Sequence, residues 1–191
     1  LLQQGKPADA GRWLEKARQL HPDAMRPLLT LTAIALQAKD NKRALELAQA
    51  GVAAHPDDQQ ALDNLGNVQF LMGEKNQSLA TYAKLVKLYP KSALAHFRLA
   101  YVQSQSGDSK AAIESLKTTL ALAPTNADAY AALIALYMKE GKSGDAVQLT
   151  QALQKQLPKL PLGFLLEGDV RMQEKKYAEA AAVYRRAAEL A

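Results

Sequence analysis

Apolar and small residues recur along the chain at the spacing of one face of a helix. Leu62, Leu65 and Gln69 are three and four residues apart, so they lie on the same side of one predicted helix. After Gly73 a second face of this kind follows, made of Ser78, Tyr82 and Leu85. The segment therefore predicts two helices joined by a short turn.

The helix pair repeats with a fixed period. Five prolines lie 34 residues apart: Pro22, Pro56, Pro90, Pro124 and Pro158. A period of this size is typical of a repeat array, in which each unit packs mainly on its neighbours. The period predicts these units: 25–58, 59–92, 93–126, 127–160 and 161–191, preceded in 1–24 by the end of a first helix and a whole second helix.

The turn inside most units contains a glycine. Gly73, Gly107 and Gly141 can adopt the left-handed conformation that ends a helix. Lys39 and Lys175 occupy the same place in two other units. Because this conformation is unfavourable for a residue with a side chain, we expect those two turns to use another geometry.

Small residues stand where the two helices of a unit must meet. Gly66, Ala100 and Gly168 let paired helices approach closely. Glu167 departs from the pattern, since the other units have leucine there: Leu31, Leu65, Leu99 and Leu133. Its carboxylate either reaches water or pairs with Arg171 one turn later, and we expect the first.

The 34-residue unit resembles the tetratricopeptide repeat (TPR). The likeness is fullest in 59–92, which has the family's succession of bulky, small, turn, aromatic and proline positions: Leu62, Leu65, Gly66, Gly73, Ser78, Tyr82, Leu85 and Pro90. The resemblance covers the whole chain. It implies an all-α fold, a right-handed α-solenoid of antiparallel helix pairs that forms the TPR superhelix.

Composition and charge exclude several kinds of chemistry. The net charge of +5 comes from scattered basic residues without a run of five like charges, so we expect no nucleic-acid partner. The absence of cysteine excludes disulfides and thiolate zinc sites. His21 and His55 recur before the proline of their units, and His96 stands at a packing position. No pair of histidines has zinc-site spacing, and no catalytic constellation is visible, so we expect no metal, no cofactor and no enzyme.

The resemblance also implies a binding surface. In such arrays the first helix of each unit lines a concave groove through its positions 2, 5, 9 and 12. The candidate groove residues at these positions are Asp63, Asn67, Phe70, Leu94, Phe97, Tyr101, Met138 and Met172, and Arg98 and Gln105 on the first helix of 93–126 are added to them. Exposed aromatic residues of this kind can anchor an extended peptide or a partner helix. The alternative is that the aromatic rings fill space between helices.

One subclass of the family holds a C-terminal carboxylate with a clamp of lysines, asparagines and an arginine. Asn64 and Arg98 match two of those five positions, but Leu29, Ala33 and Leu94 occupy the other three. A charged tail would meet leucines there, so we expect no such clamp.

A narrower resemblance concerns the segment 157–188. It is similar to the TPR lipoproteins of bacterial exosortase (PEP-CTERM) systems through "LLEGDV" followed by "YAEAAAVYRRA". This implies a role in exopolysaccharide production or protein sorting, at the cell envelope (periplasm or outer membrane) rather than in the cytoplasm. The lipid anchor would lie outside the chain, which begins at Leu1 and has no apolar run of membrane-spanning length.

The expected partner class and its alternatives follow from these resemblances. We expect a protein-interaction scaffold that binds an unidentified protein or peptide. The alternatives are a saccharide-binding module that uses Asp63, Asn67, Arg98 and Gln105, and an assembly factor for pilus or cellulose export. The alanine-rich last helix lacks one polar outer face, so we also expect end-to-end self-stacking.

Overall fold

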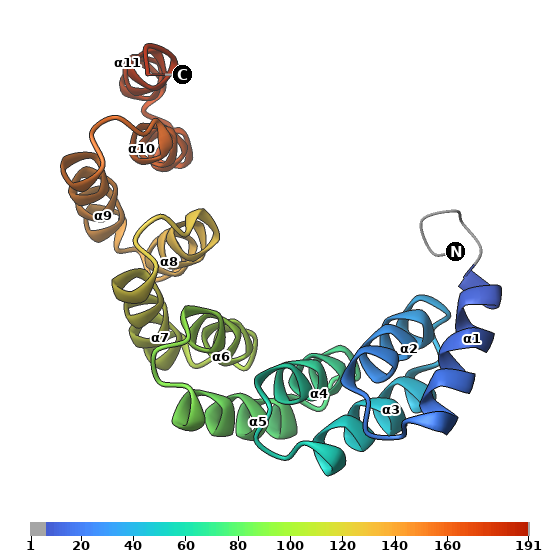
Figure 1. Ribbon diagram of the computed structural model, residues 1–191. Helices are drawn as coiled ribbons and strands as arrows, with labels where there is room; N and C mark the ends of the chain where they lie inside the picture. The colour runs from blue at the N-terminus through green and yellow to red at the C-terminus, as the bar shows by residue number, and fades with distance from the viewer. Residues whose placement is uncertain (1–6, 191) are drawn as a thin grey trace. The chain divides into compact units, whose positions relative to one another are not determined.

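The computed structural model describes residues 7–190, and every regular element in this range is an α-helix. Consecutive helices are joined by short turns and alternate in direction (Figure 1). In chain order they are α1 (Pro7–Leu20), α2 (Met25–Gln37), α3 (Asn41–Ala54), α4 (Gln59–Leu71), α5 (Lys75–Leu88), α6 (Ala93–Gln105), α7 (Ser109–Leu122), α8 (Ala127–Lys139), α9 (Ser143–Gln156), α10 (Leu162–Gln173) and α11 (Tyr177–Ala188).

Each 34-residue segment that the sequence marks out contains two of these helices. The pairs are α2 and α3, α4 and α5, α6 and α7, α8 and α9, and α10 and α11, while α1 lies in 1–24. Residues 1–6, where the end of an earlier helix is expected, are outside the described residues. The all-α prediction is confirmed for the part of the chain that is described.

The contacts divide the chain into two compact units, residues 1–107 (unit 1) and 108–191 (unit 2). The division falls at the turn between α6 and α7, inside the segment 93–126. Within unit 1, α2, α4 and α6 lie on one side and α3 and α5 on the other (Figure 1). Within unit 2, α8 and α10 lie on one side and α7 and α9 on the other (Figure 1).

In two of the repeats, a glycine on the first helix packs against a tyrosine ring on the second. A Cβ atom placed on Gly66 of α4 would lie 2.8–3.0 Å from the ring of Tyr82 on α5. A Cβ atom on Gly168 of α10 would lie 2.3–2.7 Å from the ring of Tyr184 on α11. Glycine is therefore required at both positions, because the tyrosine ring fills the space of the missing side chain.

The backbone of the turns corrects one expectation. Lys39 and Lys175 have φ angles of 58° and 61°, in the same left-handed region as Gly73, Gly107 and Gly141 with 81°, 88° and 73°. The prediction of another geometry was wrong. The repeat imposes one turn conformation on all five copies, and the two lysines adopt it despite their Cβ atoms.

Replacing Lys175 by glycine should therefore stabilise the protein by about 1 kcal/mol, because the left-handed conformation costs a residue with a Cβ atom about that much. The gain should appear as a higher urea midpoint with an unchanged slope. Gly141→Ala is the matched control in unit 2 and should lower the free energy of unfolding by a similar amount. Its Cβ would meet nothing within 4 Å, so the loss comes from the backbone conformation alone. An equal or lower midpoint for Lys175→Gly would contradict the strain at this turn.

In unit 1, a hydrogen bond that occurs twice joins the loops that precede α2, α4 and α6. His55 Nε2 donates to the carbonyl of Asp23 at 2.7 Å, and Tyr89 Oη donates to the carbonyl of Asp57 at 2.6 Å. The donors are one period apart, and so are the acceptors. The recurrence of histidine before the proline is thus explained for His55 as an inter-repeat contact.

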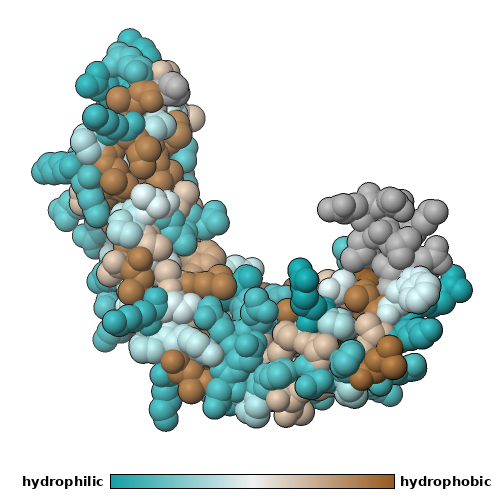
Figure 2. Space-filling model, in the orientation of Figure 1, coloured by the Kyte–Doolittle hydropathy of each residue, from teal (hydrophilic) through white to brown (hydrophobic). Residues whose placement is uncertain are grey.

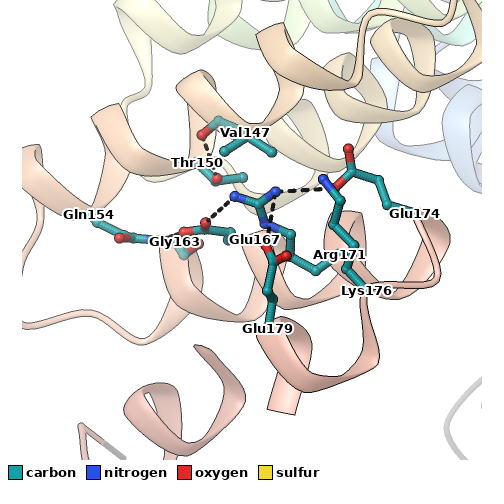
Figure 3. A network of polar contacts seen from close by, with 9 residues as sticks. All are labelled: Val147, Thr150, Gln154, Gly163, Glu167, Arg171, Glu174, Lys176 and Glu179. Atoms are coloured by element: carbon teal, nitrogen blue, oxygen red, sulfur yellow. Dashed lines mark hydrogen bonds and ion pairs between the residues drawn. The ribbon is translucent and has the colours of Figure 1, made fainter. Parts of the chain in front are cut away.

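Glu167 gives the second correction. It is only 7 % exposed, and its carboxylate accepts from Gln154 Nε2 at 2.7 Å and pairs with Arg171 at 3.3 Å (Figure 3). The expectation that it reaches water was wrong. The pairing succeeds because Arg171 lies one turn later on the same helix face and Gln154 approaches from α9.

Arg171 extends this contact into a network at the junction of α9, α10 and α11 (Figure 3). Its guanidinium also pairs with Glu174 at 3.2 Å and with Glu179 at 3.3 Å. A hydrogen bond from Ser143, with further contacts to Lys176 and Arg171, holds the pKa of Glu174 below its usual value. The network thus joins the end of one repeat to the whole of the next.

Candidate peptide-binding groove

The first helices of successive repeats in unit 1 contact one another directly, α2 with α4 and α4 with α6. Where the three meet, side chains enclose a cavity of about 240 Å³. Its lining comes from α2 (Leu29), from α4 (Gln60, Asp63, Asn64 and Asn67) and from α6 (Arg98). We call this cavity the polar pocket.

An ion pair and a hydrogen bond fix part of the polar pocket. Arg98 Nε donates to Asp63 Oδ1 at 3.1 Å, which links α6 to α4. Asn64 Nδ2 donates to Thr32 Oγ1 at 3.3 Å, which links α4 to α2. Because both residues of the ion pair are partly exposed, we assign it a positioning role more than a stabilising one.

Two amides of the polar pocket remain available. The side chains of Gln60 and Asn67 have no hydrogen-bond partner among the described residues. Each amide can both donate and accept. The polar pocket therefore offers free donors and acceptors beside the fixed Asp63–Arg98 pair.

Apolar side chains lie on α4 and α6 of the same unit. The rings of Phe70 and Tyr101 meet edge to face, with centroids 5.1 Å apart and an angle of 64° between their planes. Tyr101 is 50 % exposed and Leu94 is also exposed, while Phe97 is half-buried. Phe70 and Tyr101 thus contact each other, and Tyr101 still presents surface, so the binding role of these rings stays a prediction.

The remaining candidate residues are more scattered. Gln105 is exposed, and its backbone carbonyl accepts a hydrogen bond from Lys75 Nζ at 2.6 Å. Met138 and Met172 belong to unit 2, where α8 and α10 contact each other. Met138 is half-buried against the core of that unit, and Met172 is exposed on α10. Hydrophobic surface is visible over α10 in Figure 2.

Three of the predicted residues, Asp63, Asn67 and Arg98, are brought together in the polar pocket. Three further residues line it: Leu29, Gln60 and Asn64. Leu29 and Gln60 stand at groove positions 5 and 2 of their units, and Asn64 matches a clamp position. The assignment of these residues to a binding function stays a prediction.

Two further findings concern metal sites and membrane-spanning helices among the described residues. No group of three or more histidine or acidic residues in 7–190 is arranged to hold a metal ion. None of the described helices has the length and apolar character needed to cross a membrane.

Solved structures similar to this chain share its fold at low sequence identity. MamA is 22 % identical with a TM-score of 0.65, over 87 % of this chain and 91 % of that one. PilF of Pseudomonas aeruginosa is 19 % identical with a TM-score of 0.75, over 95 % and 83 %. YrrB, described as a TPR protein with an unusual peptide-binding site, is 16 % identical with a TM-score of 0.61, over 93 % and 91 %.

Comparison of the sequence alone gives the family. No curated protein matches the chain significantly. A family model described as the tetratricopeptide repeat matches residues 1–68 and 103–163, which is more than half of the chain. A second model with the same description matches residues 60–92. The chain therefore belongs to the tetratricopeptide repeat family.

Proposed function

We propose that this protein is a non-catalytic interaction scaffold that binds an extended segment of a partner protein along α2, α4 and α6. The observation that carries the proposal is the polar pocket. It combines two amides without partners, Gln60 and Asn67, with a fixed Asp63–Arg98 pair.

The geometry suits an extended peptide. The main chain of such a peptide has N–H and C=O groups that need partners, and the Gln60 and Asn67 amides can serve both kinds. Leu94 and Tyr101 expose apolar surface on α6 for a bulky side chain of the same peptide. Polar contacts would set the register of the segment, and the apolar contact would supply most of the affinity.

Similar proteins support this kind of partner. TPR proteins bind protein or peptide partners, and YrrB is described as having an unusual peptide-binding site. That description applies to YrrB, whose identity to this chain is 16 %. The residues of the polar pocket must therefore be tested on this chain itself.

The test uses peptides selected from a random displayed library on the purified protein. Asn67→Ala and Tyr101→Ala should each weaken a selected peptide at least about tenfold, a loss of about 1.4 kcal/mol, in a fluorescence-anisotropy titration. Tyr177→Ala is the matched control, because Tyr177 is also exposed (60 % against 50 % for Tyr101) but lies on α11. Selected peptides that bind both variants as well as the unchanged protein would overturn the assignment of the groove.

A second candidate function is saccharide binding. It is favoured by one observation, that the polar pocket is lined mainly by the amide, carboxylate and guanidinium groups that also recognise sugar hydroxyls. Acidic and neutral exopolysaccharide fragments titrated by calorimetry would distinguish the two functions. Heat that saturates and is lost in Asn67→Ala would favour the saccharide, whereas no heat at millimolar fragment would eliminate it.

We place the scaffold in a bacterial envelope system for exopolysaccharide production or protein sorting. The support is the amino-acid sequence of α10 and α11, which is similar to that of the repeat lipoproteins of exosortase systems. Fractionation of cells that produce the whole protein, with and without globomycin to block lipoprotein processing, tests the placement. Recovery with the cytoplasmic fraction in both conditions would contradict it.

A further inference from the structure

Unit 2 contains a second cavity, of about 360 Å³, between α7, α8 and α9. Its apolar lining comes from all three helices: Leu120, Tyr130, Leu133, Tyr137, Leu149 and Leu153. This volume is at the small end of the range for ligand pockets in proteins, so it suits one bulky side chain better than a whole large ligand. We call it the α8 pocket.

The α8 pocket lies on the other face of α8 from the predicted groove. Tyr130, Leu133 and Tyr137 are three and four residues apart, so they share one face of the helix. At 100° per residue, the groove positions of this helix, such as Ala131 and Ala135, point roughly opposite to that face. The α8 pocket is therefore separate from the surface of the proposed function and does not depend on it.

The packing of the neighbouring helices leaves space here. Helix α8 packs less extensively on α9 than α4 does on α5, and α9 packs extensively on α10 instead. The space that remains between α7, α8 and α9 is the cavity.

Tyr130 is the residue that indicates a ligand. It is only 4 % exposed, it lines the cavity, and its hydroxyl has no hydrogen-bond partner among the described residues. Burial raises its pKa. The hydroxyl is open to the cavity, so it can donate a hydrogen bond to a group that is bound there.

The other polar groups of the α8 pocket can also donate hydrogen bonds. Tyr137 Oη and the Gln156 amide also lack a hydrogen-bond partner in the described part of the chain, and the Lys117 ammonium completes the lining. All of them can donate, and no carboxylate lines the cavity. Lys117 pairs with Glu114 at 2.9 Å, but both side chains are exposed, so this weak pair leaves the ammonium open to another anion.

We propose that the α8 pocket is a second binding site, which receives a bulky apolar side chain of a partner polypeptide that carries a carboxylate next to it. The side chain fills the space between Leu133, Leu149 and Leu153. The carboxylate accepts hydrogen bonds from Tyr130 and Lys117. A polypeptide is favoured over a lipid because the volume fits a single anchor residue and because the family binds proteins and peptides.

The probe for this proposal is N-acetyl-tryptophan, which carries an apolar side chain beside a carboxylate. It is titrated into the protein with leucine methyl groups labelled, and methyl shifts are followed by NMR. We expect saturable shifts at Leu133, Leu149 and Leu153, and weaker binding of N-acetyl-tryptophanamide, which lacks the charge. Shifts that do not saturate, or that are absent from these methyl groups at the highest soluble concentration, would overturn the proposal.

Two variants test the polar contacts without removing the apolar lining. Tyr130→Phe removes one hydroxyl and should weaken N-acetyl-tryptophan about three- to tenfold, the range of one net hydrogen bond. Lys117→Gln should remove the preference for the acid over the amide. Tyr101→Phe in unit 1 is the matched control and should change nothing at these methyl groups. Unchanged affinity in Tyr130→Phe, with a folded spectrum, would also count against the site.

Discussion

Replacing Arg171 by methionine is expected to lower the free energy of unfolding by about 3 kcal/mol, the lower end of the range for breaking a buried ion pair. The side chain of Arg171 is 17 % exposed and that of Glu167 9 %. Without the guanidinium, the Glu167 carboxylate would keep Gln154 as a partner but would have no opposite charge beside it. Urea unfolding followed by circular dichroism, with hydrogen exchange of the α10 amides, measures the loss.

The double replacement Glu167→Leu with Arg171→Met distinguishes the loss of the Glu167–Arg171 ion pair from the loss of the other contacts of Arg171. The preceding repeat has Leu133 and Tyr137 at the corresponding positions, so an apolar pair suits this place in the fold. We expect the double variant to recover most of the stability, because buried ion pairs can be replaced by packed apolar residues at little cost. If the double variant is as unstable as Arg171→Met alone, the loss comes from contacts with Glu174 and Glu179 instead.

The same network shows what the sequence could predict and what it could not. The 34-residue period placed the helix pairs, because apolar spacing and turn residues are local properties. The environment of Glu167 depends on Gln154, thirteen residues away on another helix, which spacing along one helix does not reveal. Lys175 was misjudged for a related reason, since the repeat imposes a left-handed turn against the local preference of the residue.

The candidate sites show the same difference between what is local in the sequence and what depends on packing. Asp63 and Asn67 could be assigned to one surface because they stand at groove positions 5 and 9 of their unit, and Arg98 because it matches a clamp position. The edge-to-face contact of Phe70 and Tyr101 could not, because it depends on the offset between α4 and α6. The α8 pocket was not predicted either, because it depends on how α7, α8 and α9 pack on one another.

Replacing Gly66 by alanine is expected to destabilise unit 1 by about 2 kcal/mol, within the usual range for overpacking a core. The new Cβ would lie 2.8–3.0 Å from three ring atoms of Tyr82. That ring cannot move aside easily, because Tyr82 is 2 % exposed and its hydroxyl donates to the carbonyl of Asp63 at 3.3 Å. The higher helix propensity of alanine offsets about 1 kcal/mol of the strain.

Two further variants show whether the clash, and not the backbone, causes that loss. Gly11→Ala in α1 adds the same atom where nothing lies within 4 Å, so it should stabilise the protein by about 0.5–1 kcal/mol. Gly66→Ala with Tyr82→Leu introduces the residue types that the next repeat has at the corresponding sequence positions, Ala100 and Leu116. The double variant should be less destabilised than the sum of its single changes, because leucine leaves room for the new methyl group. Additive losses, measured by urea unfolding, would show that Tyr82 does not require glycine opposite it.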